Sequence, residues 1–225
     1  MKTELLGISF SIIGSKEALR KTNSYLKEKK LRIVAYVSAH ELILVHDSEE
    51  KNKWWTKIDL TVCEDEEVLK AVGMTEPVRI REAKEKKYLH EFLKLLSVGR
   101  KEIFLITKKE ESLITFEEKL KKLQPDLKLV GKAWVDAYPE NKEGLINSIN
   151  LLAPEIILSQ LPYPEGIRLI YDYSKYSNAS LWCMMSQILD SSHGHNWLDK
   201  INKFIYKKLL NRIINHSKDT EKGEI

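Results

Sequence analysis

Four acidic residues follow an apolar run in "IDLTVCEDEEVL", residues 58–69. Asp65 comes where this predicted strand opens into a loop, a place from which a carboxylate can act as a general base on a bound substrate. Such a base would be exposed and would add little to stability. The same cluster also fits the acidic first turn of a helix, which the helix dipole stabilises. From spacing alone, the helix start is the favoured interpretation.

A second candidate site follows "IILSQL", residues 156–161, which predicts a buried strand ending in a Pro-Tyr-Pro loop. In open α/β sheets, ligands bind in the crevice outside the carboxyl ends of the strands. Pro162 and Pro164 stiffen this loop and remove two backbone donors that could meet a phosphate group. Glu165 follows, either as a functional carboxylate or as an ordinary acidic residue in a first helical turn.

Several other kinds of site are absent from the sequence. The nine glycines are scattered, so neither a Walker loop nor a dinucleotide-binding loop is present. A serine nucleophile elbow is also missing. His193 and His195 could ligate a metal, but they lack Cys or carboxylate partners at a recognisable spacing, so a solvated loop is favoured. We therefore expect neither a metal nor a cofactor.

Length and composition indicate one globular domain with an appendage. The chain has 225 residues, of which 43% are hydrophobic, and its net charge of +4 comes from 37 basic and 33 acidic residues. Such a mixed surface does not indicate a nucleic-acid partner. Cys63 and Cys183 lie in apolar runs, which fits buried thiols in a reducing cytoplasm. We recognise neither a signal peptide nor an apolar run of ~18 residues, so any membrane contact is expected to be peripheral.

Apolar, strand-like runs alternate with helical patterns along most of the chain. This alternation predicts an α/β fold, a Rossmann-like sandwich with a mainly parallel sheet. The predicted strands are 5–13, 31–37, 58–63, 102–107, 126–131, 154–161 and 179–185. Helices are predicted at 15–30 with Ser15 as N-cap, at 81–96, 110–123 and 140–152, and after the prolines.

The pattern changes near residue 192, where "SSHGHN" precedes a basic amphipathic helix. We predict a domain over residues 1–192, the helix over 193–216 and a disordered tail over 217–225. The helix can lie on an anionic membrane, or its apolar face can pack on the core or on a second subunit. The residues expected to contact the membrane are Trp197, Lys200, Lys203, Phe204, Lys207, Lys208 and Arg212.

The order of these segments resembles the WecG/TagA/CpsF glycosyltransferases over residues 5–190. "RIVAYVSAHELILVHDSEE" is similar to the family's strand and Asn-Ala-(Glu/His) turn, and "IDLTVCEDEEVL" falls on its strand ending in Pro-Asp-Gly. "EPVRI" resembles Pro-Glu-Arg-Val. "LINSINLLAPEIILSQLPYPEGIRLI" resembles the Ile-Asn helix, the next strand and the Gly-x-Gly-x-Pro-Lys-Gln-Glu loop.

The resemblance implies an inverting transferase that moves N-acetylmannosamine from a UDP donor to a lipid-linked N-acetylglucosamine acceptor during synthesis of wall or surface polysaccharide. It implies Asp65 as the base. Four further positions correspond to substrate-binding residues of the family, namely Ser38, Arg79, Pro162 and Glu165. It also implies a cytoplasmic enzyme at the inner face of the membrane.

Several family positions carry other residues here. Ser38 replaces Asn, Glu66 replaces the Gly after the base, and Pro164 replaces Gln. The two loop glycines correspond to Ser159 and Leu161, whose side chains would crowd a phosphate that approaches the backbone. Two functions therefore stay open. The chain is either a transferase with an altered donor or acceptor, or an inactive relative that binds or scaffolds a partner, as a homo-oligomer or with an active paralogue.

Overall fold

The computed structural model describes residues 2–6, 8–28, 30–46 and 50–185. Its centre is a sheet of six strands, all parallel, in the order β4-β3-β8-β7-β5-β6. The α/β fold with a parallel sheet is therefore confirmed. In this order the strands are β4 (Leu60–Cys63), β3 (Arg32–Val37), β8 (Leu181–Met184), β7 (Ile156–Gln160), β5 (Glu102–Thr107) and β6 (Lys128–Trp134).

Both faces of the sheet are buried, because alternate side chains of each strand point into two separate cores. In β7, for example, Ile157 belongs to one core, while Ile156 and Leu158 belong to the other. This two-sided burial explains why the inner strands are continuous apolar runs rather than alternating patterns.

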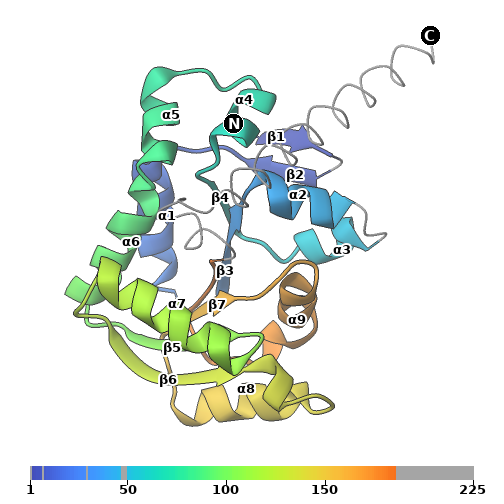
Figure 1. Ribbon diagram of the computed structural model, residues 1–225, viewed down its shortest axis with the longest axis vertical. Helices are drawn as coiled ribbons and strands as arrows, with labels where there is room; N and C mark the ends of the chain where they lie inside the picture. Colours follow the sequence, from blue (N-terminus) through green and yellow to red (C-terminus); the bar gives the residue numbers. More distant parts are fainter. Residues whose placement is uncertain (1, 7, 29, 47–49, 186–225) are drawn as a thin grey trace.

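Helices cover both faces and make three layers. The layer of α1 (Ser15–Tyr25), α6 (Lys87–Val98) and α7 (Glu110–Leu123) packs on one face. The other face carries α2 (Ala39–His46), α3 (Lys51–Trp55), α8 (Lys142–Leu151) and α9 (Glu165–Tyr173). Figure 1 shows α1 beside α6 at one side of the sheet, and α2 and α3 at the other. The short helices α4 (Glu66–Ala71) and α5 (Pro77–Lys84) follow β4, and the short 3-10 turns η1 (Val135–Ala137) and η2 (Ser174–Tyr176) follow β6 and α9.

The first predicted strand, 5–13, is instead a small antiparallel hairpin of β1 (Lys2–Leu5) and β2 (Ile8–Ser11). It lies beside β4 without joining the main sheet, and the hydroxyl of Thr61 bonds to the backbone of Ser11 in both directions. Leu6 has a φ of 58°, so the chain reverses where its apolar residues predict a continuous strand.

Two helix predictions are also corrected. Helix α1 begins at Ser15 with Gly14 as its N-cap and ends at Tyr25, so Ser15 is not the cap. The helix predicted over 81–96 is two helices, α5 and α6, separated at Lys86, whose φ of 47° is left-handed. A left-handed residue cannot continue a right-handed helix, so the chain changes direction there.

Cys63 and Cys183 are free thiols, as predicted, but only Cys183 is buried, and Cys63 is half-buried. The boundary near residue 192, the helix predicted over 193–216 and the tail lie outside the described residues. So do His193 and His195. In the part of the chain that the structure describes, no helix is long and apolar enough to cross a membrane.

Candidate active site at the carboxyl edge of the sheet

Because all six strands are parallel, the segments that follow them emerge at one edge of the sheet. Ser38 follows β3, Asp65 follows β4, Lys108 follows β5, and Pro162 follows β7. The sequence predicted three of these four positions. Lys108 was missed, since a lysine in a polar loop gives no local signal of what it contacts.

Asp65 is the N-cap of α4, where its Oδ1 accepts hydrogen bonds from the backbone nitrogens of Glu67 (2.9 Å) and Val68 (3.4 Å). Its Oδ2 accepts a third bond, of 2.9 Å, from the backbone nitrogen of Ala39. The helix-start interpretation is therefore confirmed, and the expectation of an exposed carboxylate is wrong, because Asp65 is half-buried. The three bonds fix the carboxylate between the loops that follow β3 and β4.

Ser38 forms a capping box with Glu41 at the start of α2. The Glu41 Oε2 atom accepts hydrogen bonds from the backbone nitrogen of Ser38, at 2.9 Å, and from its hydroxyl. Glu41 is buried, with 2% of its surface exposed. The Ser-x-x-Glu pattern at 38–41 is a sequence signal that could have predicted this pair, and α2 with it.

Arg79 lies on α5, where its Nη1 donates a 3.0 Å hydrogen bond to Glu82 Oε2. The same carboxylate oxygen accepts a 3.3 Å bond from the backbone nitrogen of Ser15. A Cβ atom on Gly14 would collide with the Arg79 Nη1, so a larger residue there would displace the guanidinium from its present position. Through Glu82, Arg79 thus joins α5 to the start of α1, and its contacts among the described residues do not include Asp65.

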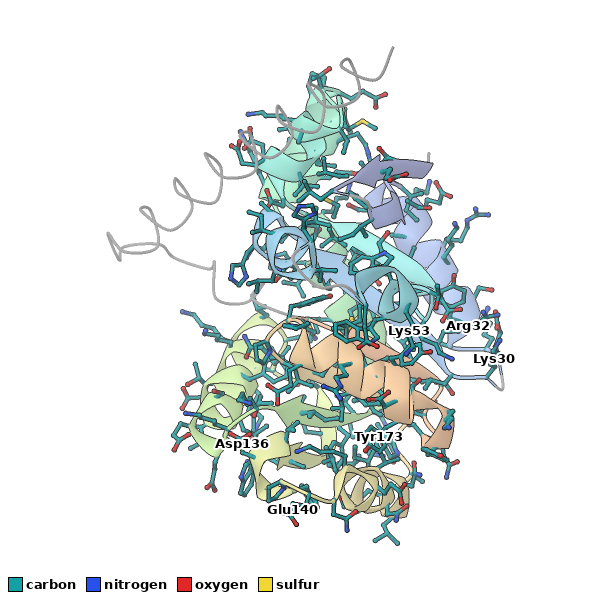
Figure 2. The ribbon with its side chains drawn as sticks, turned by 90° about the vertical axis from the view of Figure 1, so that its right-hand side faces the viewer. Lys30, Arg32, Lys53, Asp136, Glu140 and Tyr173 are labelled. Carbon is teal, nitrogen blue, oxygen red and sulfur yellow. The ribbon has the colours of Figure 1, made fainter. Side chains whose placement is uncertain are left out.

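Glu165 is the first residue of α9 and forms an ion pair with Lys108. The Lys108 Nζ lies 2.9 Å and 2.7 Å from the two Glu165 oxygens, and 3.5 Å from Asp136 Oδ1. The pKa of Lys108 is raised, chiefly by its hydrogen bond to Glu165. Figure 2 shows Asp136 and Lys53 on either side of α9. The cluster of Lys108, Asp136 and Glu165 therefore gathers residues that follow β5, β6 and β7.

The loop between β7 and α9 differs from the prediction in one respect. Ser159 lies inside β7, fully buried, and its hydroxyl accepts a 2.9 Å hydrogen bond from the indole nitrogen of Trp182. It therefore packs in the core and does not line the loop. Leu161 and Tyr163 are also buried, so the exposed Pro162 and Pro164 form the outer surface of this turn.

Glu64 is the second residue that the sequence analysis missed. Burial raises its pKa to about 7, against the opposing effect of hydrogen bonds from the backbone nitrogens of Tyr88 and Leu89. It lines a small cleft together with Ser15, Cys63, Arg79 and Tyr88. A glutamate directly after an apolar strand was the only available signal, and it does not tell which way the side chain points.

No group of three or more His, Cys, Asp or Glu side chains able to hold a metal ion occurs within residues 2–6, 8–28, 30–46 and 50–185. Two cations described above are engaged by carboxylates, Arg79 by Glu82 and Lys108 by Glu165. The fixed carboxylate of Asp65 and these two cations are groups that could act on an anionic ligand.

A sequence model of the glycosyl transferase WecG/TagA/CpsF family matches residues 3–196. The chain belongs to this family. The match covers the whole sheet and every element around it, and the family's members are glycosyltransferases of cell-surface polysaccharide synthesis. A comparison with curated proteins gave no match.

Proposed function

We propose that this glycosyltransferase moves an N-acetylhexosamine from a UDP-sugar to a lipid-linked acceptor, with Asp65 as the general base. The observation that carries the proposal is the geometry of the Asp65 carboxylate. Its Oδ2 accepts one hydrogen bond, from Ala39, which leaves a second lone pair for an acceptor hydroxyl. The other oxygen holds the start of α4 and keeps the group in place.

In this reaction the acceptor hydroxyl gives its proton to Asp65 Oδ2 as its oxygen bonds to the anomeric carbon of the donor. The bond from that carbon to the diphosphate breaks, and UDP leaves with the electron pair. Attack from the face opposite UDP inverts the anomeric centre. A positioned base contributes about 10²–10⁴-fold to such a step.

Arg79 and Lys108 are the proposed contacts for the donor diphosphate and its surroundings, with Ser38, Pro162 and Glu165 as further substrate contacts. Each cation is held by a glutamate, so the donor must compete with Glu82 or Glu165 for it. This competition supports weak binding of the family's own donor.

The second candidate is an inactive relative that binds or scaffolds a partner, such as an active paralogue. The specific observation in its favour is that Ser38, Arg79 and Glu165 are all engaged by other protein groups. Titration of the purified chain with UDP-N-acetylmannosamine, UDP-N-acetylglucosamine and UDP separates the two. Saturable binding of a UDP-sugar supports the transferase, while no binding at millimolar donor supports the inactive relative.

We also propose that the C-terminal helix predicted over residues 193–216 brings the enzyme to an anionic membrane at the cytoplasmic face, where a lipid-linked acceptor is available. The support is its sequence, which places Lys200, Lys203, Lys207 and Lys208 beside an apolar face that contains Phe204. Packing of the same face on the core or on a second subunit is the alternative.

A further inference from the structure

Glu64, the residue directly before Asp65, caps a helix that is distant in the sequence. Its Oε1 accepts a 2.7 Å hydrogen bond from the backbone nitrogen of Tyr88, the second residue of α6. The resemblance places a proline at position 64, so this link is a feature of the present chain rather than of the family's Pro-Asp-Gly turn. Two neighbouring carboxylates therefore hold the starts of three helices, Glu64 that of α6 and Asp65 those of α4 and α2.

The other oxygen of Glu64 is buried and has no hydrogen-bond partner among the described residues. The hydroxyl of Tyr36, on the neighbouring strand β3, is also buried without a hydrogen-bond partner among the described residues. Burial raises the pKa of Tyr36, and the charge of Glu64 adds to this effect. In these buried surroundings an ionised Glu64 has only the α6 amides and Lys86 to compensate its charge, whereas a protonated Glu64 carries no charge to compensate.

The charged and titratable groups around Glu64 come from α5, the start of α6, β3 and its own strand, while α1 and α4 line the same cleft with uncharged residues. They are Arg79 and Glu82 from α5, Lys86 and Tyr88 at the start of α6, Tyr36 from β3 and Cys63 from its own strand. Burial outweighs the favourable effects of Lys86 and the α6 amides and raises the pKa of Glu64 to about 7, and Glu82 acts in the same direction as burial.

We propose that Glu64 is a positioning residue for Asp65 and that it does this as a neutral carboxylic acid, so that its ionisation loosens the turn carrying Asp65 from the start of α6. The expected effect of Glu64 on catalysis rests on the proposed role of Asp65 as the base. Its expected effect on the structure rests only on the Glu64–Tyr88 contact and on the unpartnered Oε2 atom of Glu64.

The first test is the stability of the full chain across pH 4–9 for wild type, Glu64→Gln and the control Glu91→Gln, an exposed residue of the same helix α6. A carboxyl whose pKa is higher folded than unfolded stabilises at low pH and loses this contribution as pH rises. For Glu64 this loss of stability falls in the window between about pH 4.5, the ordinary pKa of a glutamate, and about pH 7, its pKa in the folded protein. Glutamine mimics the neutral acid and has no such window.

We expect the unfolding equilibrium constant of wild type to rise relative to that of Glu64→Gln by about tenfold per pH unit within this window, and to level off above it. Glu91→Gln should follow wild type throughout. Glu64→Ala, which cannot accept the Tyr88 bond, should be less stable than Glu64→Gln at every pH. The proposal would be overturned if the stability of wild type and of Glu64→Gln changed with pH in parallel. It would also be overturned if Glu64→Gln and Glu64→Ala lost the same stability relative to wild type.

The second test asks whether the effect reaches Asp65, by hydrogen exchange at the amides of Glu67 and Val68, which bond to its carboxylate. Their protection factors should fall in wild type as pH passes about 7 and should stay constant in Glu64→Gln. If transfer is detected, its kcat should fall over the same range in wild type alone, with KM unchanged. Exchange that is pH-independent in both proteins overturns the positioning role. Absence of any transfer counts against the proposed function and leaves the exchange result to decide about Glu64.

Discussion

The carboxylate of Asp65 is tied to the backbone of Ala39, with 2.9 Å between Oδ2 and the amide nitrogen. Ala39 is the first residue of the helix after β3, and Asp65 ends the turn after β4, so one side chain joins the exits of two neighbouring strands. A residue proposed as a base is thus also a structural residue. Tests of its chemistry must therefore be run where every variant is folded.

Replacement of Asp65 by alanine should destabilise the protein by about 2–4 kcal/mol. About 1 kcal/mol comes from the lost cap of α4, and the rest from the amide of Ala39, a buried residue, which loses its acceptor. Urea unfolding of Asp65→Ala and of the control Asp126→Ala, an exposed loop residue, measures this difference. Equal midpoints for the two variants would show that the Asp65 bonds add nothing.

Ser38→Ala should cost about 1 kcal/mol, because α2 loses the hydroxyl of its capping box and Glu41 loses a donor. The matched control is Ser112→Ala in the exposed first turn of α7, which should change stability by less than about 0.5 kcal/mol. Thermal unfolding of the two variants under identical conditions provides the comparison. A smaller loss for Ser38 than for Ser112 would contradict the capping role.

The Lys108–Glu165 pair should add less than about 1 kcal/mol to stability, because its side chains are 37% and 39% exposed and water screens their attraction. The exchanged pair Lys108→Glu with Glu165→Lys should regain the stability lost by either single variant. It should not regain UDP-sugar binding, because the signs presented to the donor are then reversed. A double-mutant cycle with donor titration measures both quantities, and wild-type donor affinity in the exchanged variant would contradict the proposed donor contacts.

Membrane attachment through the C-terminal helix predicts co-sedimentation of the full chain with anionic vesicles at low salt. Reversal of its four lysines, Lys200, Lys203, Lys207 and Lys208, to glutamate should abolish binding, since each contributes about 1 kcal/mol at an anionic surface. The same reversal at four exposed lysines of the domain, Lys16, Lys27, Lys94 and Lys122, gives an equal net charge and is the control. Equal loss in both variants would show that net charge alone, and not the helix, attracts the membrane.

The sequence predicted the sheet because its inner strands are buried on both faces and stand out as apolar runs between helices, as in "EIFLIT" and "EIILSQ". It did not predict α2, because the periodicity of the short apolar run "AHELILVH" does not separate a strand from a helix and the capping-box pattern before it was overlooked. The break at Lys86 was also missed, since neither glycine nor proline marks it.

The candidate site was predictable only where a local pattern carries it. Asp65 could be placed at the end of its strand, and the run of acidic residues around it predicted the start of a helix, though not that Asp65 is the N-cap. The partner of Glu165 could not be predicted, because Lys108 is 57 residues away and meets it only through the pairing of β5 with β7. The contact of Glu64 with Tyr88 depends likewise on how α6 packs against the sheet.

The measurement that tests the central claim most directly is transfer from a panel of UDP-N-acetylhexosamines to a lipid-linked acceptor, by wild type and Asp65→Asn. Asparagine keeps an oxygen that can cap α4, but its amide cannot take a proton from the acceptor hydroxyl. Single-turnover rates are compared well below the melting temperatures of both proteins, so that both are folded. We predict measurable transfer by wild type with at least one donor. In the variant we predict a rate that is reduced at least about 100-fold. Transfer at the wild-type rate by Asp65→Asn would contradict the account.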